Sequence, residues 1–128
     1  MREIKFRAWD KNKKQMINHL ENIQFDFEGR PVCIKSQYDL EVKDGQNSGV
    51  YERLAFEIDL MQYIGLKDKN GKEIYCGDIF NLGDKNIKYV VEWHDCGFSG
   101  RQIENQSRVG LVYWNERIEV MGNIYEDL

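Results

Sequence analysis

The chain has 128 residues and a mass of 15.2 kDa; 41% of the residues are hydrophobic, 12% aromatic and 31% charged. This length suits one domain, and the apolar content is enough to close a core, which excludes a wholly disordered chain. The 18 basic and 22 acidic side chains give a net charge of −4, which argues against a general nucleic-acid coat protein. Apolar runs are far shorter than the roughly 20 residues that span a bilayer. We therefore expect no membrane segment, and no signal peptide.

In the first part of the chain, apolar and charged residues alternate over residues 4–9, which predicts a strand with one face on a core. A polar turn follows at residues 10–14, and the alternation resumes over residues 16–27. We therefore expect these two runs to form a β-hairpin. Residues 43–49 contain two glycines and no apolar residue, and they predict a loop.

In the second part, residues 56–65 fit both helical and strand spacing, and we favour a strand. Asn70 and Gly71 tolerate positive φ, which a tight hairpin turn demands. Further short strands are expected at residues 79–82, 87–93, 108–114 and 118–125. Short strands separated by polar or glycine-containing turns are typical of a small barrel or sandwich.

Four segments, in this order, closely resemble the YopX family, whose members are small proteins encoded by phages and prophages. They are MREIKFRAWD (residues 1–10), LMQYIGLKDKNGKEIYCGDI (60–79), YVVEW (89–93) and EVMGNIYE (119–126). The resemblance covers nearly the whole chain, although residues 26–55 carry little of the pattern. It implies a compact β-rich phage protein of a family whose molecular activity is not established, and it supplies no catalytic residue.

The expected fold is mainly β, with an N-terminal β-hairpin region and a C-terminal small barrel of SH3-like character. We treat residues 1–128 as a single YopX-like domain. Two subdomains are compatible with the pattern, an N-terminal β region over residues 1–59 and the barrel over residues 60–128. A variable insert is expected near residues 26–55 of the first.

Three cysteines, Cys33, Cys76 and Cys96, are too widely spaced for a zinc knuckle or a thioredoxin-like motif. We expect reduced thiols that pack as small hydrophobic side chains. Cys96 lies two residues from His94, so on a strand the two side chains would share a face. Nothing around them marks an oxyanion hole or a set of metal ligands. The sequence therefore predicts no enzyme, no metal site and no cofactor.

Aromatic residues are the remaining candidates for contact with a partner. The adjacent pair Tyr113 and Trp114 is the best single pointer, because two successive side chains of a strand face opposite ways. One ring must then face outward, although aromatic side chains of small β proteins mostly build the core.

The predicted function is that of a non-enzymatic accessory protein of a phage or prophage, acting in the host cytoplasm through protein–protein contacts. Self-association into a homo-oligomer or binding to a phage or host protein would both fit, since unpaired strand edges favour pairing with another chain. The alternative is a nucleic-acid-binding accessory protein of phage DNA metabolism or regulation. Its contacts would come from the basic N-terminal residues Lys5, Arg7, Lys11, Lys13 and Lys14.

Overall fold

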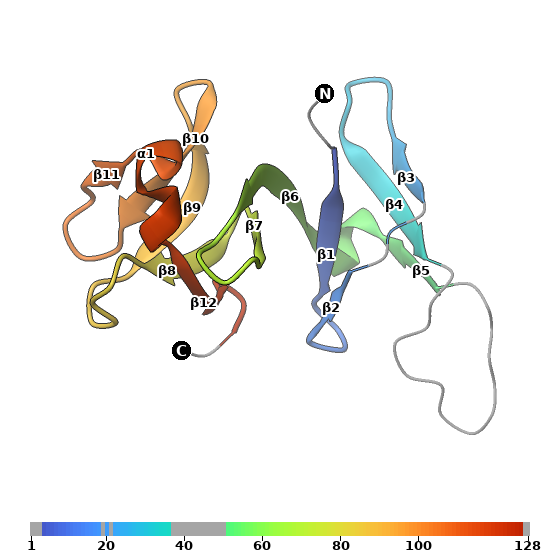
Figure 1. The fold of residues 1–128 in the computed structure, drawn as a ribbon. Helices are drawn as coiled ribbons and strands as arrows, with labels where there is room; N and C mark the ends of the chain where they lie inside the picture. Colours follow the sequence, from blue (N-terminus) through green and yellow to red (C-terminus); the bar gives the residue numbers. More distant parts are fainter. Residues whose placement is uncertain (1–3, 19, 21, 37–50, 127–128) are drawn as a thin grey trace. The chain divides into compact units, whose positions relative to one another are not determined.

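A computed structural model describes residues 4–18, 20, 22–36 and 51–126 (Figure 1). The chain forms two compact units. Residues 6–61 make up the first, which we call the N-terminal unit. Residues 62–128 together with residues 1–5 make up the second, which we call the C-terminal unit. Ile4 and Lys5 thus belong with the second half of the chain.

The N-terminal unit contains two groups of antiparallel strands. β1 pairs with β2, and β3, β4 and β5 form a three-stranded sheet in that order. Ala8, Ile17 and Ile58 are buried together between these elements and β6. The elements are β1 (Phe6–Asp10), β2 (Gln15–Ile17), β3 (Asn22–Phe25), β4 (Pro31–Ser36), β5 (Tyr51–Leu54) and the short 3-10 helix η1 (Ala55–Glu57).

The predicted hairpin at the start of the chain is confirmed, with Trp9 opposite Met16. Asp10 closes its turn, because one carboxylate oxygen accepts the backbone N–H groups of Asn12 and Lys13. The prediction that residues 16–27 continue this hairpin is wrong. β2 ends at Ile17, and the later residues begin the separate sheet of β3, β4 and β5. Residues 26–55, expected as an insert, carry β4 and β5, while the loop predicted at residues 43–49 lies outside the described residues.

The C-terminal unit is built on a five-stranded antiparallel sheet in the order β11-β10-β9-β8-β12. Strand β6 begins in the N-terminal unit and continues into this one, where it pairs with β7. The elements are β6 (Ile58–Lys67), β7 (Glu73–Tyr75), β8 (Asp78–Asn81), β9 (Tyr89–His94), β10 (Gly97–Gln102), β11 (Arg108–Val109), the one-turn helix α1 (Leu111–Trp114), the 3-10 helix η2 (Asn115–Arg117) and β12 (Glu119–Asn123).

The turn between β6 and β7 confirms the prediction at Asn70 and Gly71, where Gly71 has a φ of +82°. The buried carboxylate of Asp68 holds this turn through the N–H groups of Asn70 and Lys72, both at 2.9 Å. Its second oxygen accepts the N–H of Val120 in β12, also at 2.9 Å. One side chain therefore fixes both the turn and the last strand.

The strand predicted over residues 108–114 is wrong beyond Val109. After Gly110 the chain forms α1, in which Leu111 is buried and Trp114 packs against the core. Residues three apart lie on the same side of a helix, so this apolar spacing suits one helical turn. In contrast, the strand predicted over residues 56–65 is present as β6, although it begins at Ile58 after η1.

The core of the C-terminal unit lies between one face of the five-stranded sheet, β6, β7 and α1. Its buried residues are Ile64, Ile74, Phe80, Val91, Leu111 and Ile118. Gly100 in β10 is required here, because a Cβ atom at this position would lie 2.5 Å from Cζ of Phe80. The observed sheets confirm a mainly β protein, while the SH3-like character of the C-terminal part stays a prediction.

Candidate functional site

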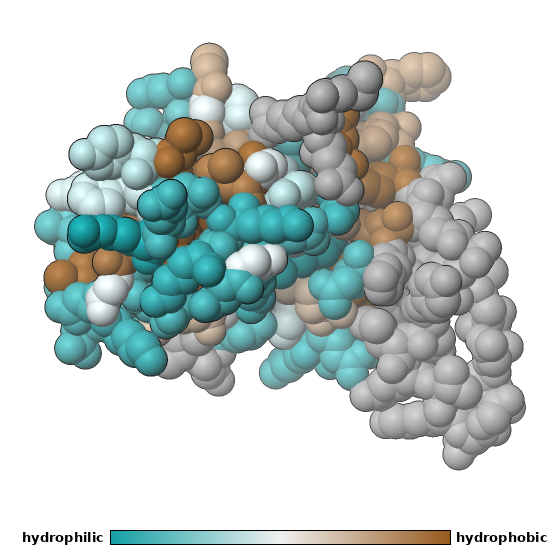
Figure 2. Space-filling view, in the orientation of Figure 1, coloured by the Kyte–Doolittle hydropathy of each residue, from teal (hydrophilic) through white to brown (hydrophobic). Residues whose placement is uncertain are grey.

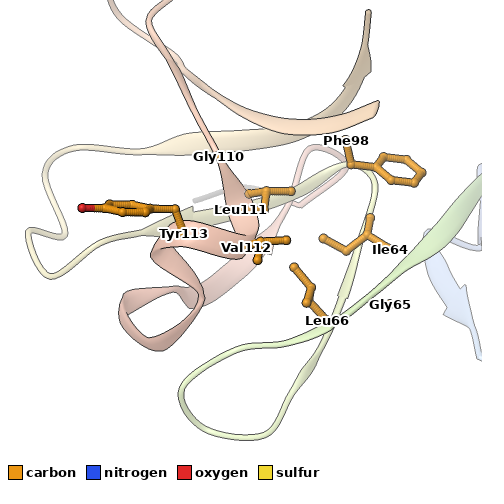
Figure 3. Close-up of a pocket in the computed structure, with 8 residues that line it drawn as sticks. All are labelled: Ile64, Gly65, Leu66, Phe98, Gly110, Leu111, Val112 and Tyr113. Carbon is orange, nitrogen blue, oxygen red and sulfur yellow. The ribbon is translucent and has the colours of Figure 1, made fainter. Parts of the chain in front are cut away.

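An open apolar groove lies in the C-terminal unit, between the end of β6, strand β10 and helix α1, with a volume of about 770 Å³ (Figure 3). No charged side chain is among the eight residues that line it: Ile64, Gly65, Leu66, Phe98, Gly110, Leu111, Val112 and Tyr113. In Figure 3 the side chains of β6 face those of Leu111 and Val112, while the ring of Tyr113 extends away from them. Tyr113 therefore forms the rim of the groove.

Two glycines shape the walls of the groove. Gly65 has a φ of +92° and lies where the pairing of β6 with β7 loses its regular register, between Tyr63 and Lys67. Only glycine adopts this backbone conformation at little cost. Gly110 lies between β11 and α1 in extended backbone, and no atom lies within 4 Å of the place that its Cβ would take. Both positions leave backbone open to a ligand.

Helix α1 turns apolar side chains outward as well as inward. Leu111 is buried, whereas 79% of Val112 and 84% of Tyr113 is exposed to solvent. A one-turn helix cannot bury all four of its side chains against one core, so two apolar residues remain at the surface. Figure 2 shows hydrophobic surface in the region that carries α1.

Helix α1 and the 3-10 helix η2 that follows it carry an aromatic pair and charged residues. The rings of Tyr113 and Trp114 meet edge to face, with centroids 5.1 Å apart, and the guanidinium of Arg117 lies 5.7 Å from the centre of the Trp114 ring. The side-chain amide of Asn115 donates a hydrogen bond of 2.5 Å to the carbonyl oxygen of Lys67. This bond ties α1 and η2 to the end of β6. Lys67, which follows the lining residue Leu66, and Arg117 are both exposed.

On the β10 side, the apolar surface continues beyond the groove. Phe98 packs edge to face against Trp93 of β9, with ring centroids 5.0 Å apart. Trp93 is largely exposed. The groove and this ring together make a surface on which an apolar segment of another molecule could rest.

Of the pair singled out in the sequence, Tyr113 lines this groove and Trp114 does not, and both residues lie on a helix and not on a strand. The expectation of one outward ring agrees with the exposure of Tyr113, because Trp114 packs on the core. The sequence analysis missed Ile64, Phe98 and Val112. The spacing of Leu111 and Trp114 in helical register was the signal available for α1.

The five basic residues of the nucleic-acid alternative occupy different environments. Lys5 belongs to the C-terminal unit, where its ammonium group lies 2.7 Å from Glu73 and holds the pKa of that carboxyl below its usual value. Arg7 is buried in the N-terminal unit. Lys11, also in that unit, lies 3.5 Å from Asp59. Lys13 and Lys14 are exposed in the turn after β1. These positions do not align the five cations along one strand face.

His94 and Cys96 lie at a tight turn between β9 and β10, in which both Asp95 and Cys96 have positive φ. The imidazole lies 3.1 Å from the carboxylate of Asp95. Burial raises the pKa of the Cys76 thiol, which keeps that group protonated at neutral pH. Nothing is described of the side chain of Cys33. Within the described residues, no three His, Cys, Asp or Glu side chains are grouped to hold a metal ion.

The fold and the groove define a small, mainly antiparallel β protein with an open apolar surface. The model of the YopX protein family matches residues 5–127, so the chain belongs to the YopX family. The crystal structure of protein EF1440 from Enterococcus faecalis is similar, with a TM-score of 0.70 and 25% sequence identity over 98% of this chain and 95% of that one. No curated protein matches the sequence. In the described part of the chain, no helix has the length and apolar character to cross a membrane.

Proposed function

We propose that this chain is a protein-interaction module without catalytic activity, encoded by a phage or prophage and acting in the cytoplasm of the host. The observation that carries the proposal is the groove beside α1. It is lined by apolar side chains, glycine and Tyr113, and the side chains of Val112 and Tyr113 are largely exposed to solvent. A contiguous exposed apolar surface is costly in water and is typical of a protein-docking site.

The composition of the groove favours a protein partner over a nucleic acid. A nucleic-acid site needs basic side chains for the phosphates, and no lysine or arginine lines the groove. Of the N-terminal cations, Lys5 and Lys11 lie beside carboxylates and Arg7 is buried. The net charge of −4 also weakens attraction to a polyanion.

A photo-reactive amino acid placed at Val112 tests the proposal in host cells that express the full chain. We expect cross-links from this position to one short apolar segment of a protein, identified by mass spectrometry and suppressed by a synthetic peptide of that segment. The control is the same group at Ile103, which is exposed and does not line the groove. Equal cross-linking at both positions, or cross-links to nucleic acid, would contradict the proposal.

A further inference from the structure

The turn between β3 and β4 has a fixed conformation, set by Asp26. One oxygen of its carboxylate accepts the N–H groups of Glu28 and Arg30, both at 2.9 Å, and its own N–H donates to the carbonyl oxygen of Arg30 at 2.9 Å. The Arg30 guanidinium adds contacts to Asp26 at 3.1 Å and to Glu28 at 2.8 Å. The backbone hydrogen bond from Arg30 is the largest cause of the lowered pKa of Asp26, so the carboxylate stays charged at neutral pH. We call residues 26–30 the tip.

Phe27 stands at the apex of the tip with its side chain fully exposed, and Phe25 just before it is also exposed. Single exposed apolar residues are common on proteins. A phenylalanine on a turn held by several hydrogen bonds differs from most of them, because less conformational entropy is lost when it binds. The tip therefore has the properties of an anchor for an apolar pocket.

We propose that Phe27 of one copy inserts into the groove of a second copy, so that the chain self-associates tip to groove. This inference rests on the proposed function, since it names a second copy of the chain as the protein that docks in the groove. A groove of about 770 Å³ lined by apolar side chains and two glycines has room for a phenylalanine ring and its turn. Burying such a ring removes a large apolar area from water, which favours association.

The charges beside the two surfaces are complementary. The tip carries the carboxylates of Asp26 and Glu28 and the guanidinium of Arg30, a net charge of −1. Lys67 follows the lining residue Leu66, and Glu116 and Arg117 follow the lining residue Tyr113 by three and four positions; all three are exposed, and their net charge is +1. Opposite net charges favour encounter in this orientation. A net negative tip also disfavours an anionic lipid surface as its target.

The expected contact is weak and directional. One turn in one groove buries much less than the roughly 1,600 Å² of a standard interface, so we expect dissociation constants of about 10 µM to 1 mM. The two surfaces differ, so each contact joins the tip of one copy to the groove of another.

Sedimentation of the full chain over this concentration range tests the inference. The wild-type average mass should rise above 15.2 kDa with concentration. Phe27→Ser and Val112→Asp should each weaken the association at least about tenfold, because each removes an apolar group from the centre of the contact. Both side chains are largely exposed, so the fold is expected to persist. The matched controls are Phe56→Ser and Ile103→Asp, at exposed positions outside both surfaces, and they should associate as the wild type does.

Mixing the two disrupted variants gives the sharpest result. Phe27→Ser keeps an intact groove and Val112→Asp keeps an intact tip, so their mixture should form one-to-one pairs although neither variant associates alone. A wild-type chain that stays monomeric overturns the inference, as does a mixture without pairs. If the chain is monomeric but Val112 still cross-links to another protein, tip-to-groove pairing is overturned and the proposed function stands.

Discussion

The two faces of the five-stranded sheet in the C-terminal unit differ in chemistry: one carries paired charges and the other carries apolar side chains. On one face, Glu92 accepts hydrogen bonds from Arg101 at 3.0 Å and from Arg108 at 2.7 Å, so opposite charges of neighbouring strands are paired with one another. On the other face, Phe80, Val91 and Tyr89 pack under α1, and the packing opens into the groove. The ion pairs of the charged face form between residues of this chain. The apolar face, in contrast, still exposes hydrophobic surface that a partner could bury.

Among variants of the two faces, Phe80→Ala is expected to cause the largest loss of stability. The ring is fully buried, stacks on Tyr89 at 5.2 Å and fills the space above Gly100. Its removal should lower the free energy of unfolding by about 3–5 kcal/mol. Urea denaturation followed by tryptophan fluorescence measures the loss. The exposed control Ile103→Ala should change stability by less than about 0.5 kcal/mol. Equal effects in the two variants would show that the apolar face is not the core described.

The next effect is expected from Asp68→Ala, which removes the buried acceptor that links the β6–β7 turn to β12. Three backbone N–H groups, of Asn70, Lys72 and Val120, lose their partner, and we expect a loss of about 2–3 kcal/mol. The control is Asp84→Ala, since Asp84 accepts one N–H in an exposed turn. It should cost less than about 1 kcal/mol by the same denaturation assay. A control that costs as much as Asp68→Ala would contradict the role given to burial.

Gly100→Ala is expected to have a moderate effect. The new methyl group would lie 2.5 Å from the Phe80 ring and 3.0 Å from Cγ2 of Val109, so the core must shift, at a cost of about 1–3 kcal/mol. Gly97→Ala in the same strand is the matched control, because no atom lies within 4 Å of its Cβ position. Thermal unfolding should separate the two variants. A Gly100→Ala protein as stable as the control would show that the core around Phe80 has room for a methyl group.

The smallest effect concerns the charged face and pH. Partial burial raises the pKa of Glu92, but the hydrogen bonds from Arg108 and Arg101 outweigh it, and the net result is a lowered pKa. A carboxyl with a folded-state pKa below its unfolded value stabilises the fold above the unfolded pKa. This stabilisation is lost as the pH falls through the folded pKa, below the ordinary value of 4.5.

The expected result is that wild type loses about 0.5–1 kcal/mol more than Glu92→Gln when denaturation is repeated at low and at neutral pH. Other carboxylates titrate in both proteins, so the difference between the two isolates Glu92. Equal losses would show that Glu92 contributes nothing to the charged face.

Local features could be predicted from the sequence. Neighbouring residues determine the turn at Asn70 and Gly71. They also determine the first hairpin, in which Trp9 lies opposite Met16. Tyr113 and Trp114 were singled out because neighbouring side chains of a strand face opposite ways. In the structure Tyr113 is exposed because it lies on the outer side of helix α1. The spacing of Leu111 and Trp114 suits a helical turn, but over four residues periodicity alone is too short a signal to overrule a predicted strand.

The groove itself could not be predicted. Ile64 and Phe98 are far apart in the sequence and come together only when β6, β10 and α1 pack in the folded chain. No local sequence pattern predicts this contact. The exposed position of Phe27 on a turn could not be predicted either. The alternation through Phe27 predicted a continuing strand, while the hydrogen bonds of Asp26 turn the chain there.

The most direct measurement of the central claim, that the groove beside α1 docks the tip of a second copy of the chain, is an amide NMR dilution series of the full chain. The account predicts concentration-dependent shifts at Leu66, Leu111 and Val112, together with shifts at Phe27 and Gly29 of the tip. The amides of Glu92 and Arg101 on the charged face should not move. Shifts confined to the charged face, or tip and groove signals that stay fixed while the average mass rises, would contradict the account.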